Sequence, residues 1–212
     1  MPEEISPFLV ICAKSFFLGI IQGLTEFLPI SSTAHLRVLP HLFGWNDPGV
    51  SLSASLQLGS AVAIIYYFRS QIILIVDSFS SIFKKRNVLN NQNSTLSAYI
   101  FIASIPIFIL GLIIKLYVPN YSDSNFRGLV SIAITSIIMG TLLALSEIYG
   151  NGKKLFKDIN LIDIIFLGFA QSLAIFPGVS RSGITLTSAL FSGIERKTAA
   201  RLSFLVGIPA IT

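Results

Sequence analysis

Two apolar runs, Ala98 to Val118 and Leu129 to Tyr149, are the features that most restrict how this chain can fold. Each has the length of about twenty residues that a helix needs to cross the hydrocarbon core of a bilayer. A third apolar run, residues 51–69, is predicted to span as well. The chain is 53% hydrophobic and only 12% charged, whereas soluble domains carry about twice that charged fraction. The sequence therefore predicts an all-α polytopic membrane protein that forms a single integral membrane domain over residues 1–212.

Two further apolar segments are interrupted by proline and continue only briefly after the break. The first resumes after Pro29 and reaches about Phe43. A helix of about a dozen residues covers less than 20 Å and cannot cross a core of about 30 Å. We therefore expect residues 8–43 to form a re-entrant helical hairpin, which enters and leaves the membrane on one face. Residues 161–194, which are broken by a Pro-Gly pair, are expected to form a second re-entrant hairpin.

The two ends of the chain carry less information. The apolar run 202–212 is too short to cross a bilayer, so it is expected to be a partial span of a longer protein. The N-terminus begins with MPEEIS, which is acidic where a secretory signal is basic, and it is expected to remain uncleaved. Cys12 is the single cysteine, so an internal disulfide is excluded.

Basic residues give an expected orientation because they gather beside the apolar runs. The clusters are Lys84, Lys85 and Arg86; Lys153, Lys154 and Lys157; and Arg196, Lys197 and Arg201. This pattern indicates membrane topology, so the net charge of +5 does not indicate a nucleic-acid partner. Loops 84–96 and 150–160 are predicted to be cytoplasmic, and loop 119–126 external. With three spans between them, the hairpins enter from opposite faces, the first from the outer face.

The two hairpins are also alike in sequence. Gly19, Gln22, Leu24 and Phe27 precede Pro29 and Ser31, while Gly168, Gln171, Leu173 and Phe176 precede Pro177 and Ser180. Related hairpins that enter from opposite faces are typical of an inverted-topology repeat, whose shared site lies near the membrane midplane. Chance similarity between two apolar helices is the alternative.

The break in the second hairpin contains Arg181, which is costly at membrane depth by about 3 kcal/mol on insertion scales. Its planar guanidinium can bind two phosphate oxygens at once. Ser180 or Ser182 can cap the following helix, whose free N–H groups would then face the same anion. Thr185 lies one turn after Arg181, on the same face. The sequence predicts an anion site here, and the alternative is an Arg181 paired with a carbonyl or a carboxylate.

The break in the first hairpin contains the acidic residue Glu26 and the pair Ser32 and His35. A buried carboxylate requires a proton or a cation, and magnesium binds one or two carboxylates together with substrate phosphates. Glu26 is therefore a predicted metal ligand. Ser32 and His35 lie three residues apart, which suits either a serine activated by histidine or a histidine that attacks phosphorus. Alternatively, Ser31 or Ser32 is only an N-cap and His35 only a satisfied polar residue.

The segments GIIQGLTEFLPISSTAHL and FPGVSRSGIT resemble the two signature segments of the undecaprenyl pyrophosphate phosphatase family, also called the bacitracin resistance protein family. The resemblance continues through QLGSAVAIIYYFR and ARLSFLVGIPA. It implies a bacterial plasma-membrane enzyme that converts undecaprenyl pyrophosphate to undecaprenyl phosphate and recycles the lipid carrier for cell-wall synthesis. It further implies bacitracin resistance, an active site open to the outer face, and a chain that continues beyond residue 212.

The resemblance assigns roles to individual residues. Those implied as catalytic are Glu26, Ser32 and His35, with Glu26 also at the metal, and those implied to bind substrate are Gln22, Ser180, Arg181, Ser182 and Thr185. The expected cofactor is a divalent cation, magnesium or calcium, and the expected partners are the lipid substrate and membrane lipid, with a homodimer left open. Many members have glutamate where this chain has Gln22, and commonly glycine where it has Ala34.

A rival hypothesis is a membrane transporter or flippase of a lipid phosphate or another anion, because secondary transporters share inverted repeats and broken helices. Such a carrier would use Arg181 and the helix N-termini. It has no need of a serine and a histidine one turn apart. The pair Ser32 and His35 therefore favours an enzyme.

Overall fold

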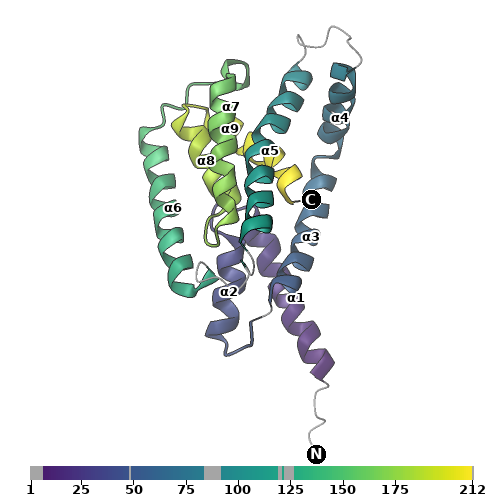
Figure 1. Cartoon of the computed structure of the whole chain (residues 1–212), viewed down its shortest axis with the longest axis vertical. Coiled ribbons are helices and arrows are strands. Elements are labelled where there is room, and N and C mark those ends of the chain that lie inside the picture. Colours follow the sequence, from purple (N-terminus) through teal and green to yellow (C-terminus); the bar gives the residue numbers. More distant parts are fainter. Residues whose placement is uncertain (1–6, 48, 84–91, 119–120, 122–126, 212) are drawn as a thin grey trace, which may run out of the picture.

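The computed structural model describes residues 7–47, 49–83, 92–118, 121 and 127–211. Within these ranges the regular secondary structure is helical, apart from one isolated bridge between Lys154 and Ile194. The helices are α1 (Pro7–Glu26), α2 (Ser32–Leu42), α3 (Gly49–Tyr67), α4 (Arg69–Phe83), α5 (Gln92–Tyr117), α6 (Leu129–Tyr149), α7 (Leu161–Ser172), α8 (Arg181–Phe191) and α9 (Arg196–Ile211), with short 3-10 turns η3 (Phe156–Asp158) and η4 (Leu173–Ile175) (Figure 1).

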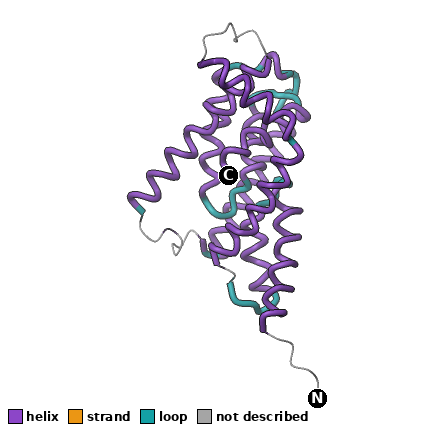
Figure 2. The backbone as a smooth tube through the Cα atoms, turned by 90° about the vertical axis from the view of Figure 1, so that its right-hand side faces the viewer, coloured by secondary structure: helices purple, strands orange, loops and turns teal. Residues whose placement is uncertain are grey.

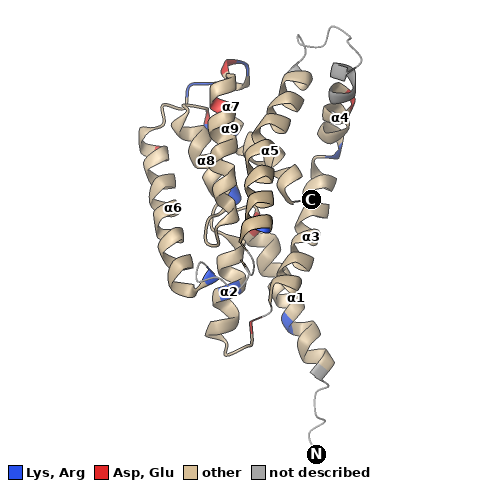
Figure 3. Cartoon of the chain, in the orientation of Figure 1, with Lys and Arg blue, Asp and Glu red and all other residues tan. Residues whose placement is uncertain are grey.

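Four helices are long and apolar enough to cross a membrane, so the protein is a multi-pass membrane protein. The candidate spans are Gly49–Tyr67 in α3, Asn93–Tyr117 in α5 and Leu129–Tyr149 in α6, together with Phe8–Glu26 in α1, which the sequence predicts to be one limb of a re-entrant hairpin. Their large apolar side chains are mostly exposed, as expected where lipid replaces water as the solvent. Helix α6 carries almost no charged side chain along its length (Figure 3).

The boundaries of the observed helices differ slightly from those of the expected spans. Helix α3 ends at Tyr67, and α4 follows with Arg69 as its first residue. Backbone hydrogen bonds from Phe68 to Ile64 and from Ile72 to Phe68, both 2.9 Å, carry the chain through this kink. The chain therefore continues beyond this kink as helix α4.

The structure describes the two expected loops 84–96 and 119–126 only in part. Helix α5 begins at Gln92, so the last residues of the expected loop 84–96 are helical. The Ser97 hydroxyl donates to the Ile75 carbonyl at 2.9 Å, which ties the start of α5 to α4. Residues 84–91, and all of 119–126 except Tyr121, lie outside the described ranges. Helix α9 begins at Arg196, so the basic cluster there is helical and the expected partial span 202–212 starts earlier.

Two helical hairpins lie end to end in the molecule. Hairpin 1 consists of α1 and α2, hairpin 2 of α7 and α8, and their turns meet in the middle of the molecule (Figure 1). Figure 2 shows the consequence, since loop segments lie at mid-height as well as at the two ends. Backbone groups of turns in the middle of the molecule need polar partners from the protein. The interface between the two turns supplies them, as described below.

Hairpin 2 forms the centre of the structure. Every residue of α8 from Ser182 to Leu190 is buried, with α6, α7 and α9 packed around it. Helix α7 lies so close to α5 that a Cβ atom at Gly168 would stand 2.9 Å from the Ala103 backbone. At its start, the Asn160 capping box and an ion pair between Lys154 and Asp163 at 2.9 Å fix the direction of α7.

Candidate active site

The carboxylate of Glu26 is the centre of the contact between the two hairpins. Glu26 is the last residue of α1 and is only 7% exposed. Its Oε2 atom accepts hydrogen bonds from the Ser32 hydroxyl at 2.6 Å and from the Gln22 side-chain amide at 3.0 Å. Gln22 stands one turn before Glu26, whereas Ser32 opens α2, so the break at Pro29 folds the serine back onto the carboxylate.

Arg181 reaches the same carboxylate from hairpin 2. It is the first residue of α8, and its Nη2 atom donates to Oε1 of Glu26 at 3.3 Å. Both side chains are nearly buried, Arg181 at 10% and Glu26 at 6% exposure. The alternative in which Arg181 pairs with a carboxylate therefore describes this structure, and the two charges offset each other's desolvation.

One nitrogen of Arg181 has no such partner. Nη1 is buried and makes no hydrogen bond within the described residues. It lies against Gly207 of α9, where a Cβ atom would collide with the guanidinium. Because a buried donor without an acceptor costs about 1–3 kcal/mol, this nitrogen is a ready site for an oxygen anion. Sequence reasoning missed Gly207, since a lone glycine in an apolar helix gives no signal of what it faces.

Ser31, in the turn of hairpin 1, contacts both the start of α2 and the ring of His35. Ser31 has a φ of 60°, in the left-handed region, and its hydroxyl caps α2 by accepting from the Ala34 N–H at 3.4 Å. The Nδ1 atom of His35 lies 2.9 Å from the Ser31 carbonyl, which makes it the N–H donor. Between Ser32 and His35 the described residues show no hydrogen bond, and the hydroxyl of Ser32 is directed to Glu26. The N-cap is therefore Ser31, one of the two serines considered.

Ser180 and Ser182 connect the turns of the two hairpins. Ser180 is the N-cap of α8 and accepts from the Gly183 N–H at 3.2 Å. The Ser180 and Ser182 hydroxyl oxygens lie 3.2 Å apart, and Ser182 donates to the carbonyls of Glu26 and Leu28 at 3.3 and 3.1 Å. Since the single hydroxyl proton of Ser182 is directed to these carbonyls, Ser180 is the donor between the two hydroxyls. The chain of hydroxyls holds hairpin 1 in position.

Thr185 shares the face of Arg181, as the spacing predicts, but its hydroxyl has other partners. It donates to the Arg181 carbonyl at 2.8 Å, and it lies 2.5 Å from the hydroxyl of Ser203 on α9. Thr185 is fully buried. A role of Thr185 in phosphate binding stays a prediction.

Helix α6 supports the turn of hairpin 2 from outside. The hydroxyls of Thr135 and Ser136 donate to the carbonyls of Pro177 and Gly178 at 2.9 and 3.3 Å. Gly178 has a φ of 94°, and a side chain there would collide with Thr135. Sequence reasoning missed this pair, although adjacent hydroxyls in an apolar helix are a usable signal for a polar partner.

The oxygen donors around Glu26 define what a cation would find. They are one carboxylate, the Ser32 hydroxyl and the Gln22 amide, whose nitrogen faces Glu26. Among the described residues no three His, Cys, Asp or Glu side chains gather as a metal cluster. This donor set fits magnesium bound by a single carboxylate, with phosphate oxygens and water completing its shell.

Comparison with known proteins places these residues in a family context. The family model described as bacitracin resistance protein BacA matches residues 15–212. A protein of Prochlorococcus marinus strain NATL1A named undecaprenyl-diphosphatase is 76% identical over 212 residues, which are 100% of this chain and 76% of the relative. A protein of the same name from Synechococcus elongatus is 47% identical over 199 residues, 94% of this chain and 69% of the relative. The turns of both hairpins, with Glu26, Ser32 and Arg181, lie inside the residues that the family model matches.

Proposed function

Because this chain belongs to the bacitracin resistance protein BacA family, we propose that it is an undecaprenyl-diphosphatase, which hydrolyses undecaprenyl pyrophosphate to undecaprenyl phosphate and inorganic phosphate. The observation that carries the proposal is the position of Glu26, between the hydroxyl of Ser32 and the guanidinium of Arg181 at 2.6 and 3.3 Å. The proposed nucleophile, Ser32, and the proposed phosphate-binding side chain, Arg181, thus both contact one buried carboxylate, which serves as the base. This arrangement supports the recycling of the cell-wall lipid carrier, and with it bacitracin resistance.

In the proposed reaction Arg181 binds the terminal phosphate, and its unpaired Nη1 donates a hydrogen bond to a phosphate oxygen in addition. Ser32 attacks the terminal phosphorus while Glu26 takes the hydroxyl proton along their hydrogen bond. The bond from phosphorus to the bridging oxygen breaks, and undecaprenyl phosphate leaves with the electron pair. Water then attacks the phosphorus of the phosphoserine and releases inorganic phosphate. Glu26 returns its proton to the Ser32 oxygen.

This assignment differs from the histidine base expected from the spacing of Ser32 and His35. Glu26 already holds the serine proton, while Nδ1 of His35 donates to the Ser31 carbonyl. That bond leaves Nε2 of His35 as the unprotonated nitrogen of the neutral ring. We assign His35 to the second step, in which it accepts a proton from the attacking water.

A divalent cation, magnesium or calcium, would be held by Glu26, with the amide oxygen of Gln22 available after rotation. When bound, it neutralises charge on the pyrophosphate oxygens. Gln22 brings no charge to the site, so the protein offers one carboxylate only. The cation would therefore bind mainly together with the substrate.

The membrane arrangement is also part of the proposal. Hairpins 1 and 2 are re-entrant and form an inverted repeat, with their turns near the midplane of the bacterial plasma membrane. The active site opens to the outer face on the side of α2. The basic connection between α6 and α7 supports this orientation, because such loops remain in the cytoplasm. Single cysteines at the exposed Asn46 and Lys153, in a Cys12-free background, test it. Labelling of intact cells is expected at Asn46 only, and labelling at Lys153 alone would reverse the orientation.

The function is tested with purified full-length protein and a polyprenyl pyrophosphate. We expect release of inorganic phosphate that requires a divalent cation and stops in Ser32→Ala, whereas Ser55→Ala on the exposed side of α3 retains the parent rate. In vesicles, movement of the lipid across the bilayer without phosphate release would favour the transporter instead.

A further inference from the structure

An apolar groove runs from the turn of hairpin 1 to the end of the molecule that carries the connection between α6 and α7. It has a volume of about 730 Å³ and lies between α3 and α4 on one side and α9 on the other. Its walls are formed by the aromatic and aliphatic side chains of Phe27, Ile64, Tyr67, Phe68 and Phe204. Phe27 follows Glu26 in the chain, so the groove reaches the immediate neighbourhood of the candidate active site.

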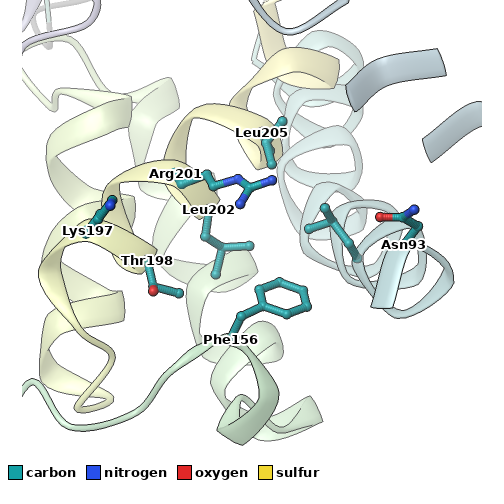
Figure 4. Close-up of a pocket in the computed structure, with 8 residues that line it drawn as sticks. Asn93, Phe156, Lys197, Thr198, Arg201, Leu202 and Leu205 are labelled. Atoms are coloured by element: carbon teal, nitrogen blue, oxygen red, sulfur yellow. The ribbon is translucent and has the colours of Figure 1, made fainter. Parts of the chain in front are cut away.

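Two cations, Lys197 and Arg201, stand one turn apart on α9 and line the end of the groove that lies away from the turn of hairpin 1. They also line a second cavity of about 190 Å³ on the other side of α9. Figure 4 shows Arg201 beside Leu202 and Leu205 in this cavity, with Phe156 nearby. Lys197 and Arg201 therefore border a cavity with apolar side chains on each side of α9.

The charges of Lys197 and Arg201 have no counterpart within the described residues. Neither forms an ion pair there, in contrast to the neighbouring Arg196, which pairs with Glu147 at 2.8 Å. On the same end of the molecule, Lys154 is paired with Asp163 at 2.9 Å. The groove thus combines unpaired positive charge at its end with apolar walls along its length.

We propose that this groove binds a membrane phospholipid with an anionic phosphate headgroup, phosphatidylglycerol in type. The phosphate lies between Lys197 and Arg201, and one acyl chain follows the groove toward Phe27. A soluble anion would leave the apolar walls uncovered, and an uncharged lipid would leave both cations without a partner. An anionic lipid satisfies the charges and the walls together.

The lipid would also act on the candidate active site, and this part rests on the proposed function. Helix α9 carries the two cations and Phe204, and three residues later Gly207, against which the Arg181 guanidinium lies. The rings of Phe204 and Phe27 pack edge to face with centroids 6.2 Å apart. An acyl chain in contact with both rings would therefore hold α9 and the turn of hairpin 1 in place. Helix α9 contacts Arg181 through Gly207, and the turn of hairpin 1 follows Glu26. We infer that anionic phospholipid stimulates the phosphatase.

Binding is measured first, without reference to activity. The full-length protein in neutral detergent is titrated with phosphatidylglycerol, and bound lipid is counted by native mass spectrometry. The double variant Lys197→Gln/Arg201→Gln is expected to bind about 30-fold more weakly, since each cation near the headgroups contributes about fivefold. The matched control is Lys153→Gln/Lys157→Gln, which removes two exposed cations from the same end of the molecule and is expected to bind as the parent does.

A third variant distinguishes the groove from general surface charge. Ala63 lines the groove and is exposed, so Ala63→Phe fills the groove while both cations remain. It is expected to lose phosphatidylglycerol binding to the same extent as the double variant. Equal binding by the two double variants, or parent-like binding by Ala63→Phe, would overturn the site.

The effect on turnover is then followed in vesicles of phosphatidylcholine with increasing phosphatidylglycerol. The parent and the Lys153→Gln/Lys157→Gln control are expected to be stimulated several-fold, and the Lys197→Gln/Arg201→Gln variant is not. Binding without stimulation would remove the link to activity and keep the site. Absence of phosphatase activity in every lipid would instead contradict the proposed function and leave the binding result unaffected.

Discussion

Hairpin 1 and hairpin 2 carry the same order of residues through their turns, but the protein buries them to very different degrees. In hairpin 2, α8 is buried over nine successive residues, from Ser182 to Leu190. In hairpin 1, α2 buries only Leu36 and Pro40. The groups of hairpin 1 that we expect to react thus lie in the less enclosed of the two hairpins, where a large lipid substrate can reach them.

The two turns also obtain their backbone geometry differently. Hairpin 2 places a glycine, Gly178, at φ 94°, and α6 donates hydroxyls to its carbonyls. Hairpin 1 places Ser31 at φ 60°, a conformation that costs a residue with a side chain about 1–2 kcal/mol. Its carbonyls accept from Ser182 of the other hairpin. Hairpin 2 is therefore the rigid scaffold, and hairpin 1 is positioned by contact with it.

The matched glutamines follow the same division. Gln22 donates to the Glu26 carboxylate at 3.0 Å, within the candidate site. Gln171, its counterpart in sequence, is fully buried and donates to the Ala103 carbonyl at 3.4 Å, where it joins α7 to α5. The same residue serves chemistry in one hairpin and packing in the other.

The largest expected effect comes from removing the charged contact between the hairpins on the hairpin 1 side. Glu26→Gln keeps the size of the side chain but removes the base for Ser32 and the carboxylate for the cation. We expect turnover to fall by at least about 10³-fold, the order seen when a base or nucleophile is lost. Activity is titrated against magnesium and calcium. Unchanged turnover with an unchanged cation requirement would exclude Glu26 as base and as ligand.

The same titration examines the neighbouring position in the opposite direction. Gln22→Glu places a second carboxylate one turn from Glu26, which gives the cation two charged ligands. We expect the cation concentration that gives half-maximal activity to fall by about tenfold. Gln171→Glu, the counterpart in hairpin 2, is expected to destabilise the protein because it buries a charge without a partner. Weaker cation binding in Gln22→Glu would contradict the metal assignment.

The arginine on the scaffold side is the next largest expected effect. Arg181→Lys keeps the charge but loses the planar pair of donors, and we expect kcat/KM to fall about 10²-fold to 10³-fold, as for the loss of one preorganised donor. Arg196→Lys, in the exposed pair with Glu147, serves as the control and is expected to leave activity near the parent value. Near-normal hydrolysis by Arg181→Lys would remove its role as the phosphate clamp.

A smaller loss is expected when the alignment of the hairpins is weakened without touching the reacting groups. Ser182→Ala leaves the carbonyls of Glu26 and Leu28 without this donor, at a cost of about 1–3 kcal/mol. We expect kcat to fall about tenfold with little change in KM. Ser188→Ala on the same helix loses only a bond to Thr185 of its own helix and is the matched control. A rise in KM with normal kcat would instead assign Ser182 to substrate binding.

The smallest expected effect concerns the strained serine in the turn of hairpin 1. Ser31→Gly relieves the left-handed strain but loses the cap, so the two changes nearly cancel. Ser31→Ala keeps the strain and loses the cap, and we expect about 1 kcal/mol of lost stability. The thermal midpoints of the two variants, measured in detergent, are compared with the parent. A more stable Ser31→Ala protein would show that the cap contributes nothing.

Apolar length and proline breaks in the sequence were enough to predict most of the helices and both turns. The candidate site was predicted as residue types, since Glu26, Ser32 and Arg181 are costly at membrane depth and so stand out from their surroundings. Gly207, Ser203 and the Thr135 and Ser136 pair were not predicted, because small residues in apolar helices are common and their partners lie far away in the chain.

The sequence by itself determined that the chain is helical, lies in a membrane and is broken at two polar turns, because each of these properties depends on residues close together in the chain. Only the tertiary structure decided which partner each polar group obtained. It paired Arg181 with Glu26 across 155 positions, directed the Ser32 hydroxyl to Glu26, and turned Ser182 toward the carbonyls of the other hairpin. A buried polar group takes whichever partner the packing brings within about 3 Å, and that distance is set by the arrangement of whole helices.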